Sequence, residues 1–289
     1  MSATDKMVST SHADIAYRES SGAGLAVLLV HGNSTSKEVF RRLTDGPLGE
    51  TYRLIAIDLP GHGGSEDARD PARTYSLPGY AAAAVEVLDS LNVRQAAVFG
   101  WSLGGHIVLE MMPHFPGLVG LMISGAPPVR PGLLGMLAGF KVMSDLRFFS
   151  KETLTASDIE RCAKTAFGAQ AEPAFVAAIR RTDGRARKLL SRSMMAGRAA
   201  DEKALVEHSP VPIGIINGAA DPMVNVRYVG RLAYNNLWDN HCYLLRDVGH
   251  APFLSAPELF DPIFARFLAD METRAAKAKP AARGGLVAA

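Results

Sequence analysis

The sequence is poor in the residues that mark several classes of protein. Only 2 of its 289 residues are cysteine, Cys162 and Cys242, and they lie far apart, so no disulfide framework is predicted. The formal net charge of +2 gives no reason to expect a nucleic-acid partner. Residues 1–6 lack the apolar core of a signal peptide, and no stretch approaches the ~20 apolar residues that span a bilayer. We therefore expect a soluble, cytoplasmic protein with no membrane span.

The pattern of a metal site is also missing. No His-x-His pair occurs among the eight histidines, so the clustered ligands of a metal-dependent hydrolytic site are not predicted, and no cofactor is expected. Basic residues do gather in one stretch, where a solvated helix face is the simplest interpretation: Arg180, Arg181, Arg185, Arg187, Lys188 and Arg192.

Apolar residues, in contrast, are abundant and regularly spaced. They make up 48% of the chain, enough to bury a large core. Short apolar runs alternate with helical segments, which is typical of an α/β protein whose mostly parallel sheet is covered by helices. We expect eight strands, the first two forming an antiparallel hairpin, at residues 7–10, 15–19, 25–30, 53–57, 96–99, 118–124, 213–216 and 242–246.

The most informative motif follows the fifth of these strands. It reads Gly100-Trp101-Ser102-Leu103-Gly104 and leads into a predicted helix from Leu103 to about Met112. A strand, G-x-S-x-G and a helix together predict a sharp turn that exposes the serine hydroxyl above the sheet. The N-terminus of the following helix favours negative charge at the same place. Ser102 is therefore the candidate nucleophile.

Two later strand ends supply partners for this serine. Asp221 follows strand 213–216, and His250 follows strand 242–246. A histidine there can take the proton of Ser102, and a carboxylate can hold the histidine in the correct tautomer. Each residue alone is also explained as part of a loop or turn. The order Ser, Asp, His, with every member at a strand end, predicts a catalytic triad.

The loop after strand 25–30 predicts an oxyanion hole. It reads His31-Gly32-Asn33-Ser34, and we assign the two donors to the backbone N–H groups of Asn33 and Leu103. Gly32 allows the chain to approach closely. Three further histidines are expected to order loops or to pack rather than to act in chemistry: His31, His62 and His106.

The alternation of strands and helices stops between two proline-rich segments. We expect a helical cap at residues 127–208, inserted into a core formed by residues 1–126 and 209–274, and a disordered tail at 275–289. Most apolar cap residues should pack the cap itself, and a few should form an acyl pocket facing Ser102. The cap residues concerned are Leu133, Leu134, Met136, Leu137, Phe140, Met143, Phe148 and Phe149.

Residues 11–268 resemble the α/β-hydrolase superfamily, and several motifs resemble a narrower group, the α/β-hydrolase-type N-acyl-homoserine lactone lactonases that degrade quorum-sensing signals. The motifs are His31-Gly32-Asn33-Ser34, the segment 99–107 around Ser102, the segments 120–129 and 181–187, Asn236-Leu237-Trp238 and the segment 249–253. The resemblance implies catalytic Ser102, Asp221 and His250 with an oxyanion hole from Asn33 and Leu103. The acid position can be Asp or Glu in such enzymes, and Asp221 is the generic choice.

The implied function is metal-independent opening of the lactone ring through an acyl-enzyme. We expect Trp101 to line the ring pocket, with packing under the cap as the alternative, and we expect the substrate to contact Gly32, Met136, Phe140 and Met223. The partner is a small acyl ester or lactone, and the oligomeric state stays open. The alternatives are a carboxylesterase, a C–C bond hydrolase and a small-molecule receptor of the same fold. Epoxide hydrolases and dehalogenases need a carboxylate where Ser102 stands.

Overall fold

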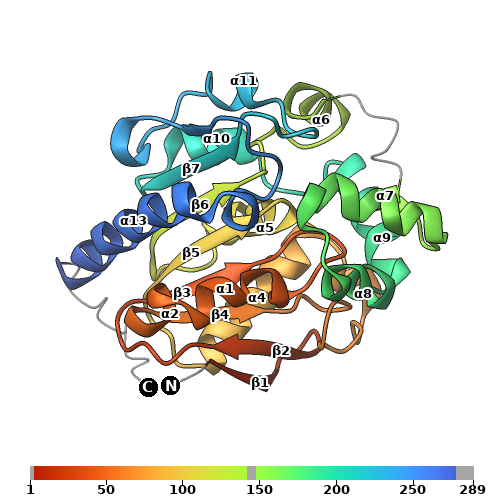
Figure 1. Ribbon diagram of the computed structural model, residues 1–289, viewed down its shortest axis with the longest axis horizontal. Coiled ribbons are helices and arrows are strands. Elements are labelled where there is room, and N and C mark those ends of the chain that lie inside the picture. Colours follow the sequence, from red (N-terminus) through yellow and green to blue (C-terminus); the bar gives the residue numbers. More distant parts are fainter. Residues whose placement is uncertain (1–2, 142–147, 278–289) are drawn as a thin grey trace, which may run out of the picture.

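A single eight-stranded sheet organises the chain, as the sequence predicted (Figure 1). The computed structural model describes residues 3–141 and 148–277. The strands lie in the order β1-β2-β4-β3-β5-β6-β7-β8. Their bounds are β1 (Thr4–Ser9), β2 (Asp14–Glu19), β3 (Ala26–Val30), β4 (Arg53–Ile57), β5 (Ala96–Trp101), β6 (Leu118–Ser124), β7 (Ile213–Gly218) and β8 (Tyr243–Leu245). The first strand thus begins three residues earlier than expected, and the last is only three residues long.

Strand direction explains where polar side chains can meet. β1 pairs antiparallel with β2, and β2 with β4, whereas the other neighbouring strands are parallel. The strands β5, β6 and β7 are buried at every position, which is why they read as continuous apolar runs. Because parallel strands end at the same edge, the loops after β3, β5, β7 and β8 come together there.

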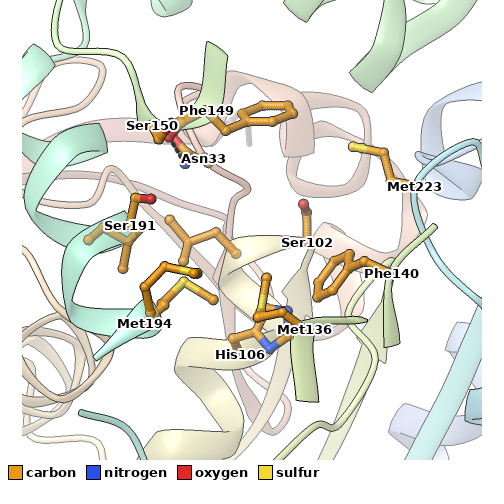
Figure 2. Close-up of a pocket in the computed structure, with 13 residues that line it drawn as sticks. Asn33, Ser102, His106, Met136, Phe140, Phe149, Ser150, Ser191, Met194 and Met223 are labelled. Atoms are coloured by element: carbon orange, nitrogen blue, oxygen red, sulfur yellow. Dashed lines mark hydrogen bonds between the residues drawn. The ribbon is translucent and has the colours of Figure 1, made fainter. Parts of the chain in front are cut away.

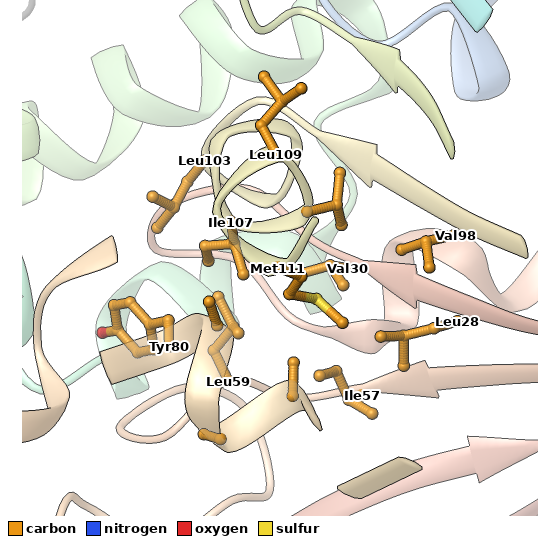
Figure 3. Close-up of a cluster of buried hydrophobic side chains, with 14 of the residues drawn as sticks. Leu28, Val30, Ile57, Leu59, Tyr80, Val98, Leu103, Ile107, Leu109 and Met111 are labelled. Atoms are coloured by element: carbon orange, nitrogen blue, oxygen red, sulfur yellow. The ribbon is translucent and has the colours of Figure 1, made fainter. Parts of the chain in front are cut away.

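Helices cover both faces of the sheet (Figure 1). Their bounds are η1 (Lys37–Phe40), α1 (Arg41–Asp45), α2 (Pro47–Thr51), α3 (Pro71–Thr74), α4 (Leu77–Ser90), α5 (Leu103–Met111), α6 (Leu133–Gly139), α7 (Ala156–Phe167), η3 (Gly168–Gln170), α8 (Pro173–Arg181), α9 (Gly184–Met195), α10 (Glu202–His208), α11 (Val226–Val229), η4 (Trp238–Asn240), α12 (Pro252–Ser255) and α13 (Pro257–Lys277). On one face α4 and α5 pack on the strands through a cluster that includes Val30, Tyr80 and Ile107 (Figure 3). This packing fixes the position of α5 under Ser102.

The segment expected to form a cap contains α6 to α10 among its described residues. Helices α7, α8 and α9 group together on one side of the molecule, while α6 and α10 lie nearer β7 (Figure 1). Three leucines of α6 that we expected to pack are instead largely exposed, at 53% for Leu133, 83% for Leu134 and 54% for Leu137. These side chains therefore leave an apolar surface on α6. Met143 lies outside the described residues.

The C-terminal tail starts later than the sequence suggested. Helix α13 continues through residues 275–277, because its last turn keeps helical pairing to Lys277. The remainder of the expected tail, residues 278–289, lies outside the described residues. Within residues 3–141 and 148–277, no helix is both long and apolar enough to cross a membrane.

Candidate active site

Ser102 occupies the turn that its motif predicts. Its backbone has φ 55° and ψ −120°, a left-handed conformation that costs a non-glycine residue about 1–3 kcal/mol. The Ser102 N–H donates to the carbonyl of Ser124 at 2.8 Å. A Cβ on Gly104 would lie 2.0 Å from the carbonyl oxygen of Val30, so only glycine allows α5 to start this close to β3. The surrounding packing thus holds the serine in its strained position.

Asp221 and His250 lie side by side although 29 residues separate them. The distance from His250 Nδ1 to Asp221 Oδ2 is 2.7 Å, and both side chains are almost fully buried. The other carboxylate oxygen of Asp221 accepts from the backbone N–H groups of Met223 at 2.8 Å and Val224 at 3.1 Å. The turn after β7 therefore fixes the carboxylate, and the carboxylate fixes the imidazole.

These contacts set the charge of Asp221. Burial raises the pKa of its carboxyl, but the attraction of His250 and the hydrogen bonds from His250, Met223 and Val224 outweigh burial and leave the pKa below its usual value. An ionised carboxylate only accepts hydrogen bonds, so Nδ1 of His250 carries a proton. Nε2 of His250 is buried and hydrogen-bonds none of the described residues. This atom is the one that could act as a base.

Trp101 positions His250 instead of lining the cavity. Its indole N–H donates to the carbonyl of His250 at 2.8 Å, and its ring centroid lies 5.5 Å from that of His250. The side chain is 1% exposed and also packs on Phe167 and Phe253. The structure therefore does not place Trp101 in a ring pocket, where the sequence analysis expected it.

The loop after β3 brings two backbone donors toward Ser102. Asn33 and Leu103 both border the cavity that contains Ser102, and no described residue accepts from their backbone N–H groups. A Cβ on Gly32 would lie 3.1 Å from Cβ of Ser102, so this glycine permits the close approach of the loop. Gly32 is not among the residues that line the cavity. An oxyanion hole needs two such unpaired donors beside the nucleophile, so its assignment to Asn33 and Leu103 stays a prediction.

A cavity of about 350 Å³ opens on Ser102 (Figure 2). Met136, Phe140 and Met223 line it, as the sequence analysis expected. Phe149, another of the cap residues from which an acyl pocket was expected, lines it too. The sequence analysis missed further lining residues, which come from α9, from the segment before α7 and from α5: Ser150, Leu190, Ser191, Met194, Met195 and His106. Leu190 and Met194 are four residues apart, which places them on one face of a helix. This spacing could have indicated that α9 presents an apolar face to the cavity. The walls are mostly apolar and suit a hydrocarbon chain.

The histidines of two loops are structural, as expected. His31 Nε2 accepts from the backbone N–H of Leu59 at 3.0 Å, and His62 Nδ1 lies 3.0 Å from the carbonyl of Pro60. Burial lowers the pKa of His31 to about 4 and that of His62 to about 3. Both rings are therefore neutral near pH 7 and order the loops after β3 and β4.

Arg187 corrects the expectation of a solvated basic face. Its side chain is buried and donates from Nε to the carbonyl of Lys151 at 2.8 Å and from Nη2 to that of Glu152 at 3.1 Å. Nη1 lies 3.4 Å from Ser34 Oγ, and Ser34 in turn donates to the side chain of Asn33 at 2.8 Å. The guanidinium therefore ties α9 to the loop of the candidate oxyanion hole.

Comparisons with known proteins define the class. A model of the alpha/beta hydrolase family matches residues 27–262, which is most of the chain. The protein belongs to this family. Among its described residues, no group of three or more His, Cys, Asp or Glu side chains is arranged to hold a metal ion.

The chain is also similar to particular hydrolases. A mutant of N-acyl homoserine lactonase AidH, complexed with N-hexanoyl homoserine, is 40% identical, with a TM-score of 0.91 over 93% of this chain and 98% of that one. The same lactonase complexed with N-butanoyl homoserine gives a TM-score of 0.90, at 40% identity over 93% and 97% of the two chains. The resemblance to N-acyl-homoserine lactonases is thereby confirmed.

Esterases are related more distantly. The pimeloyl-acyl-carrier-protein methyl ester esterase of Methylococcus capsulatus is 29% identical over 261 residues, covering 87% of this chain and 97% of that one. Esterase RhEst1 from Rhodococcus sp. ECU1013 shares 23% identity and a TM-score of 0.69 over 94% and 100% of the two chains, which shows the fold alone. The similarity to the methyl ester esterase supports an ester hydrolase.

Proposed function

We propose that this protein is a serine hydrolase that opens the lactone ring of N-acyl homoserine lactones without a metal ion. The observation that carries the proposal is the similarity, along nearly the whole chain, to a lactonase solved with N-acyl homoserines. The apolar cavity beside Ser102 supports it, because it offers room for an acyl chain next to a nucleophile. Ser102, His250 and Asp221 carry the chemistry.

The first step forms an acyl-enzyme. Ser102 Oγ attacks the lactone carbonyl while Nε2 of His250 takes the hydroxyl proton, and Asp221 stabilises the resulting imidazolium. The backbone N–H groups of Asn33 and Leu103 donate to the oxyanion of the tetrahedral intermediate. When the intermediate collapses, the ring C–O bond breaks and His250 returns the proton to the ring oxygen. The product alcohol stays attached to the acyl group.

The second step must compete with re-closure of the ring. The tethered hydroxyl can attack the acyl-enzyme with an effective concentration of roughly 10⁵ M or more when it is well oriented. The site must therefore turn this hydroxyl away and admit a water to His250. His250 takes a proton from the water, whose oxygen attacks the acyl carbon, and Ser102 leaves with the proton to release the N-acyl homoserine.

An esterase acting on small acyl esters is the second candidate. The 29% identity to a methyl ester esterase over most of both chains favours it. The same three residues would act, but the alcohol would leave the site after the first step. The two candidates differ in the substrate and not in the nucleophile.

A pH-stat assay of ring opening separates the candidates. We expect the protein to open N-butanoyl and N-octanoyl homoserine lactone faster than it hydrolyses p-nitrophenyl butyrate, with or without a chelator. Ser102→Ala should reduce both rates by at least about 10³-fold. The control is Ser191→Ala, which removes another hydroxyl from the same cavity wall and should retain ring opening. Ester hydrolysis without lactone opening would contradict the proposal and favour the esterase.

A further inference from the structure

The cavity wall contains a second histidine–carboxylate pair. His106 and Glu202 are 3% and 2% exposed, and His106 Nδ1 lies 2.8 and 2.9 Å from the two carboxylate oxygens of Glu202. Glu202 also accepts from the backbone N–H of Val129 at 3.1 Å. The pair joins α5 to the start of α10, and it plays no part in the mechanism above.

The pair leaves one ring atom of His106 for another partner. Both carboxyl oxygens of Glu202 face Nδ1, so this contact engages Nδ1 and not Nε2. No described residue hydrogen-bonds Nε2, although the ring lines the same cavity as Ser102. Figure 2 shows the ring near Met136 and away from Asn33, and its centroid lies 5.8 Å from that of Phe140. Nε2 is thus a polar atom in the apolar part of the cavity.

The position of His106 suits contact with the acyl part of a substrate. Ser102 caps the N-terminus of α5, His106 lies in the first turns of this helix, and both line the same cavity. A substrate attacked by Ser102 can therefore extend its acyl chain past this ring. An apolar side chain would complete the wall at less cost than a buried polar pair, which needs all its hydrogen bonds satisfied.

We propose that Nε2 of His106 hydrogen-bonds a hydroxyl group carried on the acyl chain of the substrate. A hydroxyl both donates and accepts, so it pairs with Nε2 whether or not that atom carries a proton. The inference rests on the proposed function, because it concerns the acyl chain of the lactone that Ser102 attacks. It makes His106 a residue that selects among acyl chains.

The test compares N-(3-hydroxyoctanoyl) and N-octanoyl homoserine lactone. We expect kcat/KM of the wild-type protein to favour the hydroxylated lactone about three- to tenfold, the range of one net hydrogen bond. His106→Leu should abolish this ratio. Glu202→Gln should keep most of it, because the ring remains and the glutamine oxygen still accepts from Val129. Ser191→Ala, the control in the same wall, should not change it.

The outcomes separate this inference from the proposed function. A purely structural pair predicts that His106→Leu and Glu202→Gln change both lactones equally, and that result would overturn the inference. If only Ser191→Ala abolished the ratio, the substrate hydroxyl would bind Ser191 of α9 and not His106, and this result would also overturn the inference. If the wild-type protein opens N-octanoyl homoserine lactone without preferring the hydroxylated one, the inference alone fails. If it opens neither lactone, both fail.

Discussion

The carboxylate of Asp221 illustrates how single atoms divide the work at this site. One oxygen accepts two backbone N–H groups and keeps the turn after β7 in place, while the other holds Nδ1 of His250. The first oxygen therefore has a structural role and the second an electrostatic one. A substitution that keeps the oxygen facing Met223 and Val224 but replaces the oxygen facing His250 should affect catalysis far more than folding.

Asp221→Asn makes this distinction. The asparagine oxygen can still accept from Met223 and Val224, but its NH₂ group then faces His250 Nδ1. That contact favours the tautomer with the proton on Nε2, which cannot take the proton of Ser102. We expect kcat for lactone opening to fall by about 10³–10⁴-fold, with little change in the urea midpoint. Asp67→Asn, which alters an exposed carboxylate, is the control. Activity within tenfold of wild type would contradict the assignment of Asp221.

The position of each candidate triad residue was predictable because each follows a strand and carries local turn chemistry. The pairing of His250 with Asp221 follows from parallel strands ending at one edge. The role of Trp101 was not predictable in this way. Whether its ring faces a cavity or packs under His250 depends on residues such as Phe167 and Phe253, which are distant in the sequence.

At the scale of elements, helix α9 is held by one buried guanidinium. Arg187 reaches the carbonyls of Lys151 and Glu152 and lies within 3.4 Å of Ser34 Oγ and the Thr182 carbonyl. Burial lowers the pKa of Arg187, because a charged guanidinium is less stable away from water. The hydrogen bonds compensate for this cost. The helix that lines the cavity is therefore fixed by a polar contact as well as by packing.

Arg187→Met should loosen this junction. Removing the guanidinium leaves buried carbonyls without donors, so we expect the free energy of unfolding to fall by about 2–4 kcal/mol in urea titrations. Arg187→Lys should recover only part of the loss, since one ammonium cannot reproduce the planar set of donors. Arg192→Met, on an exposed position of the same helix, is the control. A Met variant as stable as wild type would show that the contacts contribute nothing.

In this region the sequence predicted where helices form, but it did not predict which residues those helices contact. Apolar residues that recur every three to four positions predict that helices form, and the structure has them at α6 to α10. This spacing does not predict which arginine is buried. Arg187 stands next to Ala186 in the buried stripe of α9, a signal that was present but outweighed by the five basic neighbours. The exposure of α6 leucines likewise depends on how segments far apart in the chain pack.

At the scale of the whole molecule, buried neutral histidines couple folding to pH. Burial lowers the pKa of His12, of His31 to about 4 and of His62 to about 3. In the unfolded chain these rings take up protons below about pH 6.5. The unfolded state therefore binds more protons, and the folded state loses stability as the pH falls from 6.5 toward 4 for His31 and toward 3 for His62.

The expected loss is large enough to measure. Each such ring contributes about 1.4 kcal/mol per pH unit within its window, so His31 and His62 together should make stability at pH 5.5 about 3 kcal/mol lower than at pH 7.5. Urea unfolding at pH 5.5, 6.5 and 7.5 measures this difference. His62→Asn should flatten the dependence, whereas His208→Asn, at an exposed position, should not. A stability that does not change across this range would contradict the burial of neutral rings.

The left-handed turn at Ser102 also constrains how this chain can evolve. A glycine at position 102 has no Cβ and would adopt the same φ without strain, so losing the serine side chain would relieve the backbone. Selection for heat resistance alone would then drive the chain toward inactivity. The serine is therefore kept only while selection acts on catalytic turnover. Substitutions in the core beneath Ser102 must supply the stability that the strained turn costs.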